Sequence, residues 1–148
     1  MTVSVDALAM KAFEALDEQG VSAVAVVDDE GMLVGQADAD ALKLIGVQFS
    51  MLGKPLWEVW EINGAPVSRW NTNELHTART EAAVDLSKSA GTCTLDSTME
   101  EMVKTVVAGH FRRLWLVDAA GKPIGVISLT DLMRAIIDRM ELTQAGAY

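Results

Sequence analysis

The stretch that decides the fold is residues 114–132, with the sequence LWLVDAAGKPIGVISLTDL. Shifted by 90 positions, it aligns without a gap to residues 24–42, VAVVDDEGMLVGQADADAL. The identical pairs include Asp28 and Asp118, Gly31 and Gly121, Gly35 and Gly125, and Leu42 and Leu132. The chain is therefore predicted to contain two copies of one supersecondary unit. We expect them to pack with pseudo-two-fold symmetry, because each copy can bury its apolar face against the other.

Each copy is predicted to contain a short extended segment, a helix, two strands and a second helix, an α/β (α+β) arrangement. In the first copy, Ser4 is expected to cap a helix over residues 5–19, and strands follow at 24–27 and 32–37. A helix then begins at Asp38 or Asp40.

The second copy repeats this order more cleanly. Thr94 or Asp96 is expected to cap a helix that includes residues 99–106, and strands follow at 114–117 and 123–127. Pro123 fits the start of an edge strand, where a missing N–H donor is tolerated. Ser128 is expected to start the last helix.

The predicted boundaries are a first repeat at residues 1–46, a connector at 47–91, a second repeat at 92–141 and a tail at 142–148. The connector contains three of the four tryptophans, Trp57, Trp60 and Trp70. We interpret them as side chains that pack the connector onto the core, since aromatic residues bury large areas. A partner-binding patch is the alternative.

Composition narrows the class of protein. Half of the 148 residues are apolar, enough for a sizeable core, and the net charge of −9 disfavours binding to nucleic acid or to an anionic membrane. Cys93 is the sole cysteine, which indicates a reducing, cytoplasmic setting. No apolar stretch approaches the roughly 18 residues of a membrane span, and the N-terminus does not resemble a signal peptide.

Catalytic and metal-binding constellations are not evident. Cys93 and His110 can be imagined as nucleophile and base, but a single cysteine beside a strand is more often a small buried residue. His76 and His110 lack the spacing of metal ligands. We therefore expect neither an enzyme nor a metal centre.

Residues 92–137, TCTLDSTMEEMVKTVVAGHFRRLWLVDAAGKPIGVISLTDLMRAII, resemble a cystathionine-β-synthase (CBS) domain. The first copy resembles the same domain more weakly, and two such domains in tandem look like a Bateman module. Within the family, HFRRLWLVD and GVISLTDL are most similar to repeats of the γ subunit of AMP-activated protein kinase and of SNF4-like proteins. The connector stretch LGKPLWEVW is also similar to SNF4-like proteins.

This resemblance implies a cleft between the repeats that binds an adenosine compound, most often AMP, ADP or ATP. Ser128 and Asp131 are three residues apart at a helix start, so both can face one point. A carboxylate there can accept from both hydroxyls of a ribose, which makes Asp131 the expected ribose ligand and Ser128 a helper near ribose or phosphate. Arg112 and Arg113 match family positions that meet phosphates, and guanidinium groups suit phosphate oxygens.

Three further positions complete the expected site. Thr94 matches the family threonine that lies beside the base and ribose. Val126 and Ile127 are expected to offer backbone groups and an apolar wall to adenine. Simpler interpretations stay open: Ser128 and Asp131 can be a helix cap and a first-turn acid, the arginines can pair with surface acids, and Thr94 can only cap its helix.

The first copy departs from this pattern. Its equivalents of Arg112, Arg113, Ser128 and Asp131 are Ser22, Ala23, Asp38 and Ala41. Asp40 is displaced by one residue, about 100° around a helix, from the place of the missing carboxylate. We therefore expect one functional site, formed mainly by the second copy, and a degenerate first site.

Two functions remain in view. The first is a regulatory module for energy sensing, in which nucleotide biases a conformational or assembly equilibrium. The second is a structural or interaction module that keeps the fold and binds no nucleotide. Homodimerisation through the helices is expected in either case, because the last helix carries more apolar residues than one side needs. A regulated protein partner is a further expectation, and no cofactor other than the regulatory nucleotide is expected.

Overall fold

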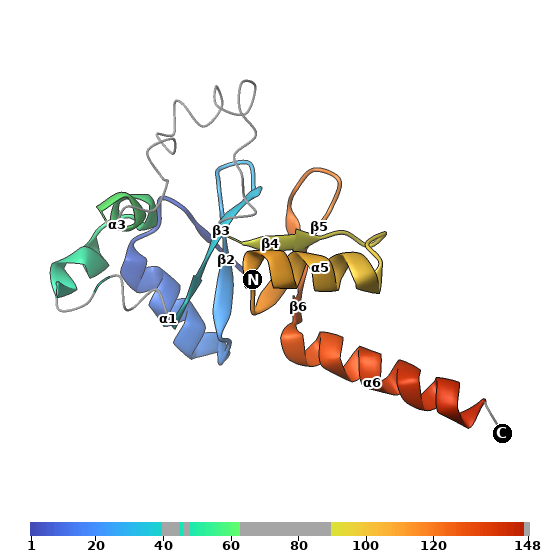
Figure 1. Ribbon diagram of the computed structural model, residues 1–148. Helices are drawn as coiled ribbons and strands as arrows, with labels where there is room; N and C mark the ends of the chain where they lie inside the picture. The colour runs from blue at the N-terminus through green and yellow to red at the C-terminus, as the bar shows by residue number, and fades with distance from the viewer. Residues whose placement is uncertain (40–44, 46–47, 63–89, 147–148) are drawn as a thin grey trace. The chain divides into compact units, whose positions relative to one another are not determined.

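The computed structural model describes residues 1–39, 45, 48–62 and 90–146. The chain divides into two compact units, Met1–Ser89 and Ala90–Tyr148. Figure 1 shows the first in blue to green and the second in yellow to red. Among the sequence predictions, residues 40–44 of the second helix of the first copy, Trp70 and His76 lie outside the described residues. Asp38, one of the two predicted starts of that helix, is instead the last residue of a strand, Leu33–Asp38.

Each unit is built around a three-stranded sheet, so the predicted α/β class is confirmed. The first unit contains β1 (Thr2–Ser4), α1 (Ala9–Gln19), β2 (Ala23–Val27), β3 (Leu33–Asp38), the short 3-10 helix η2 (Phe49–Gly53) and α3 (Leu56–Ile62). The second contains β4 (Gly91–Cys93), α5 (Met99–Gly109), β5 (Arg113–Val117), β6 (Pro123–Ser128) and α6 (Leu129–Ala145). In each sheet the first strand pairs parallel with the second, and the second pairs antiparallel with the third.

The 90-residue repeat holds at the level of individual hydrogen bonds. Asp28 Oδ1 accepts from the N–H groups of Glu30 and Met32 at 3.0 and 2.9 Å. Asp118 Oδ1 accepts from the equivalent two N–H groups, both at 2.9 Å. Gly31 and Gly121 share a positive φ, 79° and 82°, which explains why both turns keep glycine. Both β-hairpins also carry an irregularity at the same place.

The helix starts differ from the predictions. Ser4 does not cap α1: it ends β1, and its hydroxyl accepts from Asp6 N–H at 3.2 Å. α1 begins at Ala9, whose N–H donates to the carbonyl of Lys54 at 2.8 Å, so the connector supplies the cap. Thr94 and Asp96 do not cap α5 either.

The cap of α5 is Thr98, in a reciprocal capping box with Glu101. Glu101 N–H donates to Thr98 Oγ1 at 3.2 Å, and Thr98 N–H donates to Glu101 Oε2 at 2.7 Å. α6 begins at Leu129, directly after Ser128, which is close to the predicted start. Pro123 is the first residue of β6, at an edge of the described sheet, as predicted.

The first part of the connector belongs to the first unit. Leu56 and Val59 of α3 are buried in its core, and Trp57 and Trp60 pack against that core. A Cβ built on Gly35 of β3 would lie 3.1 Å from Trp60 Cη2. The interpretation of the connector tryptophans as packing side chains is confirmed for these two.

The buried core is divided unequally. Of the described residues, fourteen buried apolar side chains lie in the first unit and five in the second. α1 buries Ala9 and Ala12, whereas α5 has no buried residue. Among the described residues, the helices of the second unit are therefore less buried than those of the first.

Candidate functional site

The antiparallel ladder of β5 and β6 brings the two arginines to the start of α6. Arg113 lies directly opposite Ser128 in the register. The N–H of Leu129, the first residue of α6, donates to the carbonyl oxygen of Arg112 at 3.1 Å. Residues far apart in the sequence, Arg112–Arg113 and Ser128–Asp131, thus meet at one end of the sheet.

Contacts of Phe111 determine the path of the backbone just before the two arginines. Its N–H donates to Val106 O at 3.1 Å, and the preceding His110 has a φ of 53°, which ends α5. A Cβ on Gly109 would overlap with Phe111 Cε2, and a Cβ on Gly91 would lie 2.5 Å from Phe111 Cδ2. The two glycines leave room for the ring, which packs at the point where β5 begins.

Ser128 and Asp131 form a reciprocal cap on α6. Asp131 Oδ2 accepts from Ser128 N–H at 2.9 Å and from Ser128 Oγ at 2.7 Å, and Asp131 N–H donates to Ser128 Oγ at 3.2 Å. These bonds from Ser128, aided by the positive charge of Arg134, lower the pKa of Asp131. Sequence reasoning overlooked Arg134, although its i+3 spacing from Asp131 was the available signal.

This cap limits what the pair can offer a ligand. Within the described part of the chain, Asp131 Oδ1 accepts no hydrogen bond, so the exposed carboxylate keeps one oxygen for a hydroxyl. The Ser128 proton is committed to Oδ2, so its hydroxyl can only accept from a ligand while the cap persists. The N–H groups of Leu129 and Asp131 also donate within the protein, to Arg112 O and Ser128 Oγ.

Val126 and Ile127 lie on opposite faces of the sheet, since neighbouring residues of a strand alternate. Val126 is opposite Trp115 and shares a face with Arg113 and Ser128. Its side chain is 52% exposed. Of the two, Val126 is therefore the residue whose side chain can form an apolar wall on the face of Arg113.

Thr94 is not brought to this group. It follows Cys93, which is level with Leu116, whereas Ser128 is level with Arg113 at the other end of β5. The register puts Thr94 about 13 Å along the strands and about 10 Å across them from Ser128. Its hydroxyl lies 3.3 Å from Ser97 Oγ.

The first repeat carries different chemistry at the equivalent place. Ala23 lies opposite Asp38, as Arg113 lies opposite Ser128. Asp38 Oδ2 accepts from Gln36 Nε2 at 3.5 Å. The equivalent of Arg112 is Ser22, and Ala41 is outside the described residues. The ladder position opposite Asp38 thus holds alanine where the second repeat has arginine, and a carboxylate there disfavours a phosphate.

Three further observations concern metal ligands, the cysteine and membrane spans. Over residues 1–39, 45, 48–62 and 90–146, His, Cys, Asp and Glu side chains form no group of three that can hold a metal ion. Cys93 is buried, and burial raises the pKa of its thiol. In the same part of the chain, no helix has both the length and the hydropathy of a membrane span.

Comparison with known proteins identifies the two repeats. Residues 1–43 and 83–138 match the CBS domain family. The chain belongs to the CBS domain family. A curated relative, the SNF1-related protein kinase regulatory subunit gamma-like PV42a of Arabidopsis thaliana, is 37% identical over 57 residues. That match covers 38% of this chain and 16% of the relative. The predicted resemblance to CBS pairs of the kinase γ type is confirmed.

Solved CBS proteins share the fold at low identity. The CBS-domain containing protein ATU1752 from Agrobacterium tumefaciens has a TM-score of 0.61 at 20% identity, over 91% of this chain and 86% of that one. CBSX2 in complex with AMP has a TM-score of 0.58 at 21% identity, over 95% and 89%. The CBS domain pair of MJ0100, in complex with 5′-methylthioadenosine and S-adenosyl-L-methionine, has 0.63 at 14% identity, over 94% and 89%.

Proposed function

We propose that this CBS pair is a regulatory module that senses AMP, ADP or ATP in the cleft between its repeats, with one functional site formed mainly by the second repeat. Asp131 would accept from the ribose hydroxyls through Oδ1, and Arg112 and Arg113 would bind the phosphates. Ser128 would accept from a ribose hydroxyl, Val126 would pack on the base, and Ile127 would contribute backbone groups. The AMP and S-adenosylmethionine bound to related CBS pairs support this ligand class.

The observation that carries the proposal is the pairing of Arg113 with Ser128, together with the bond from Leu129 N–H to Arg112 O. It brings the backbone of both arginines to the start of the helix that carries Asp131. Two cations and a carboxylate at one end of a sheet would suit a nucleotide. The role of Thr94 stays a separate prediction. A ligand bound at Asp131 would have to extend along the whole sheet to reach Thr94.

The remaining predictions follow from this role. The module would bind without catalysing a reaction, would respond to energy state, and would act in the cytoplasm on a protein partner. A homodimer through the CBS helices is supported by the exposed apolar residues of α6, among them Met133 and Ile137. We retain residues 1–46 and 92–141 as the repeats, 47–91 as the connector and 142–148 as the tail.

One observation favours the alternative, a CBS pair that serves as a structural or interaction module without nucleotide. The bonds between Ser128 and Asp131 already give both side chains a task as a helix cap. A helix cap needs no ligand to explain it. The first repeat also lacks the equivalent cation and carboxylate.

Calorimetry with two matched variants separates these functions. AMP, ADP, ATP and S-adenosylmethionine are titrated into the natural chain, Asp131→Ala and Thr98→Ala. Both substitutions remove a capping residue, at a cost of about 1 kcal/mol, but only Asp131 belongs to the proposed site. We expect about one ligand per chain, lost in Asp131→Ala and kept in Thr98→Ala.

Two other outcomes argue against the proposal. Silence from all four ligands in the natural chain would leave the structural module as the function. Equal weakening by both variants would mean that Asp131 acts only through helix stability.

A further inference from the structure

One pair of equivalent apolar residues is buried in the first repeat and exposed in the second. Val5 of the first repeat is 2% exposed, whereas its counterpart Leu95 is 79% exposed. Val5 lies beneath a segment of the connector, residues 54–60, which we call the strap. Within the described residues, the second repeat has no such segment over Leu95.

The strap is held to the first repeat by three backbone hydrogen bonds. Ala9 N–H donates to Lys54 O at 2.8 Å, Leu56 N–H to Ala7 O at 2.9 Å, and Trp57 N–H to Val5 O at 3.3 Å. In the second repeat, the groups equivalent to Ala9 N–H, Ala7 O and Val5 O are Met99 N–H, Ser97 O and Leu95 O. In the described part of the chain, these three groups have no backbone partner outside α5.

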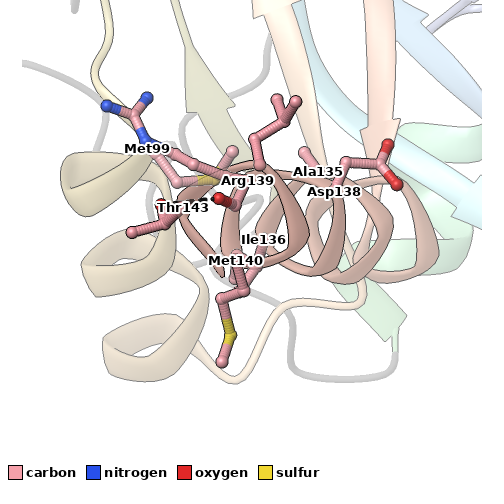
Figure 2. A pocket seen from close by; sticks show the side chains of 8 residues that line it. Met99, Ala135, Ile136, Asp138, Arg139, Met140 and Thr143 are labelled. Atoms are coloured by element: carbon pink, nitrogen blue, oxygen red, sulfur yellow. Dashed lines mark hydrogen bonds between the residues drawn. The ribbon is translucent and has the colours of Figure 1, made fainter. Parts of the chain in front are cut away.

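A groove of about 640 Å³ lies beside these counterparts. It is formed by Met99 at the start of α5 and by the 135–143 stretch of α6, including Ala135, Ile136, Met140 and Leu142. Figure 2 shows Met99 on one helix and the other labelled side chains along α6. We call this surface, together with Leu95, the second-repeat groove.

Two lining residues identify the groove with the place of the strap. Met99 and Ala135 are the counterparts of Ala9 and Ile45. In the first repeat, Ala9 and Ile45 belong to the core cluster that includes Met51, Leu56 and Val59. Among the described residues of the second repeat, no equivalent apolar side chains fill this place.

The path of the chain explains the difference. In the first repeat, η2 begins at Phe49, four residues after Ile45, and the strap follows η2 directly. α6 instead continues as one helix from Leu129 to Ala145, past the position equivalent to Ile45. Figure 1 shows this long helix in red. In the second repeat, residues 139–145, the counterparts of residues 49–55, therefore belong to α6 and do not turn back toward α5.

We propose that the second-repeat groove binds a segment of a partner protein in the way that the strap binds the first repeat. The partner segment would be extended over about three residues, to pair with Leu95 O, Ser97 O and Met99 N–H, and would then form a helical turn. Large apolar side chains at spacings of three and four, as in Leu56, Val59 and Trp60, would fill the groove.

A second copy cannot supply a segment of this kind, because its own strap is already in use. In every copy, Leu56 and Val59 are already buried in the first repeat. Removing them from their own core to cover another copy exposes as much apolar surface as it buries. This docking site is independent of the nucleotide site.

A peptide of residues 48–62, QFSMLGKPLWEVWEI, with a fluorescent label, is the probe. Fluorescence polarisation measures its binding to the full chain, to Met140→Asp and to Ile137→Asp. The two substituted residues are similarly exposed, at 58% and 52%, but only Met140 lines the groove. We expect saturable binding that weakens at least about tenfold in Met140→Asp and is unchanged in Ile137→Asp.

A second peptide, with aspartate in place of Leu56 and Val59, should not bind. Absence of binding by the natural peptide up to about 1 mM would overturn the proposal. Binding that is equally strong in Met140→Asp would also overturn it, because the peptide would then occupy another surface. If light scattering shows a dimer that Met140→Asp alone dissociates, a second copy covers the groove and the partner assignment is wrong.

Discussion

Phe111 lies over Gly91 so closely that a Cβ on this glycine would be 2.5 Å from Phe111 Cδ2. The contact joins the start of β4 to the turn between α5 and β5. Because Arg112 and Arg113 follow Phe111 directly, the same contact sets where the two cations enter the sheet. The fit of a ring against a glycine is thus part of the construction of the candidate site.

Gly91→Ala should lower the free energy of unfolding by about 1–3 kcal/mol, because the added methyl group overpacks against the Phe111 ring. Gly53→Ala is the matched control, since a Cβ there meets nothing within 4 Å, and its effect should stay within about 1 kcal/mol. Denaturant unfolding measures both. In the background of Phe111→Leu, the cost of Gly91→Ala should shrink but not vanish, because the added Cβ would still lie 2.7 Å from Leu114 Cδ2. A cost that does not change at all would contradict the Phe111 contact.

Leu56→Ala should cost about 2–5 kcal/mol, because this connector residue is 3% exposed and lies in the core of the first repeat. Leu142→Ala should change stability by no more than about 0.5 kcal/mol, since Leu142 is exposed near the end of α6. Thermal or denaturant unfolding compares the two leucines. Equal effects would show that the connector is not part of the first repeat.

Arg113→Ala should weaken binding of ATP at least about tenfold and leave adenosine binding unchanged, since only ATP carries phosphates. Lys122→Ala removes one positive charge from the turn between β5 and β6 and is the control. Calorimetry at fixed ionic strength gives both affinities. A uniform loss for ATP and adenosine would assign Arg113 a role in the fold instead of in phosphate binding.

Stability should depend on Asp131 below about pH 4, near the ordinary pKa of an aspartate. The hydrogen bonds from Ser128 lower the pKa of Asp131 in the folded protein, so its contribution is present above the unfolded-state pKa. It is lost as the pH falls through the folded-state pKa. Asp131→Asn should therefore flatten the acid limb of the stability curve, a modest effect because the carboxylate is exposed.

Asp138→Asn is the control for this prediction, because it also removes one negative charge from α6. Unfolding midpoints from pH 7 to pH 2 give the two curves. An acid limb that Asp138→Asn flattens as much as Asp131→Asn would attribute the pH dependence to net charge.

The repeat predicted most of the fold because its signals are local. Asp28 and Asp118 with their glycines mark the same turn in each copy, and the strands between them follow from apolar runs. The helix starts were less predictable. Ala9 is capped by Lys54, a partner 45 residues away that no local pattern indicates. Thr98 and Glu101 carried a recognisable capping-box spacing, but Thr94 and Asp96 offered competing caps nearby.

The candidate site was predictable in part. Ser128 and Asp131 were adjacent by helix geometry, and the ladder adds Arg113 because β5 and β6 are antiparallel. The separation of Thr94 from them could not be predicted, because a family position does not specify where a residue lies in one sheet. The parallel register of β4 and β5 carries it toward Val117, away from the arginines.

The unequal cores have a consequence for how the protein opens. Among the described residues, the second repeat has five buried apolar side chains and the first has fourteen. The second repeat therefore has less hydrophobic stabilisation of its own, and its amides should exchange with solvent before those of the first. A ligand that binds only the folded second repeat would slow that exchange. At a ligand concentration of a hundred times the dissociation constant, the free energy of opening would rise by about 2.7 kcal/mol. Local unfolding and ligand binding would then be linked in the same half of the molecule.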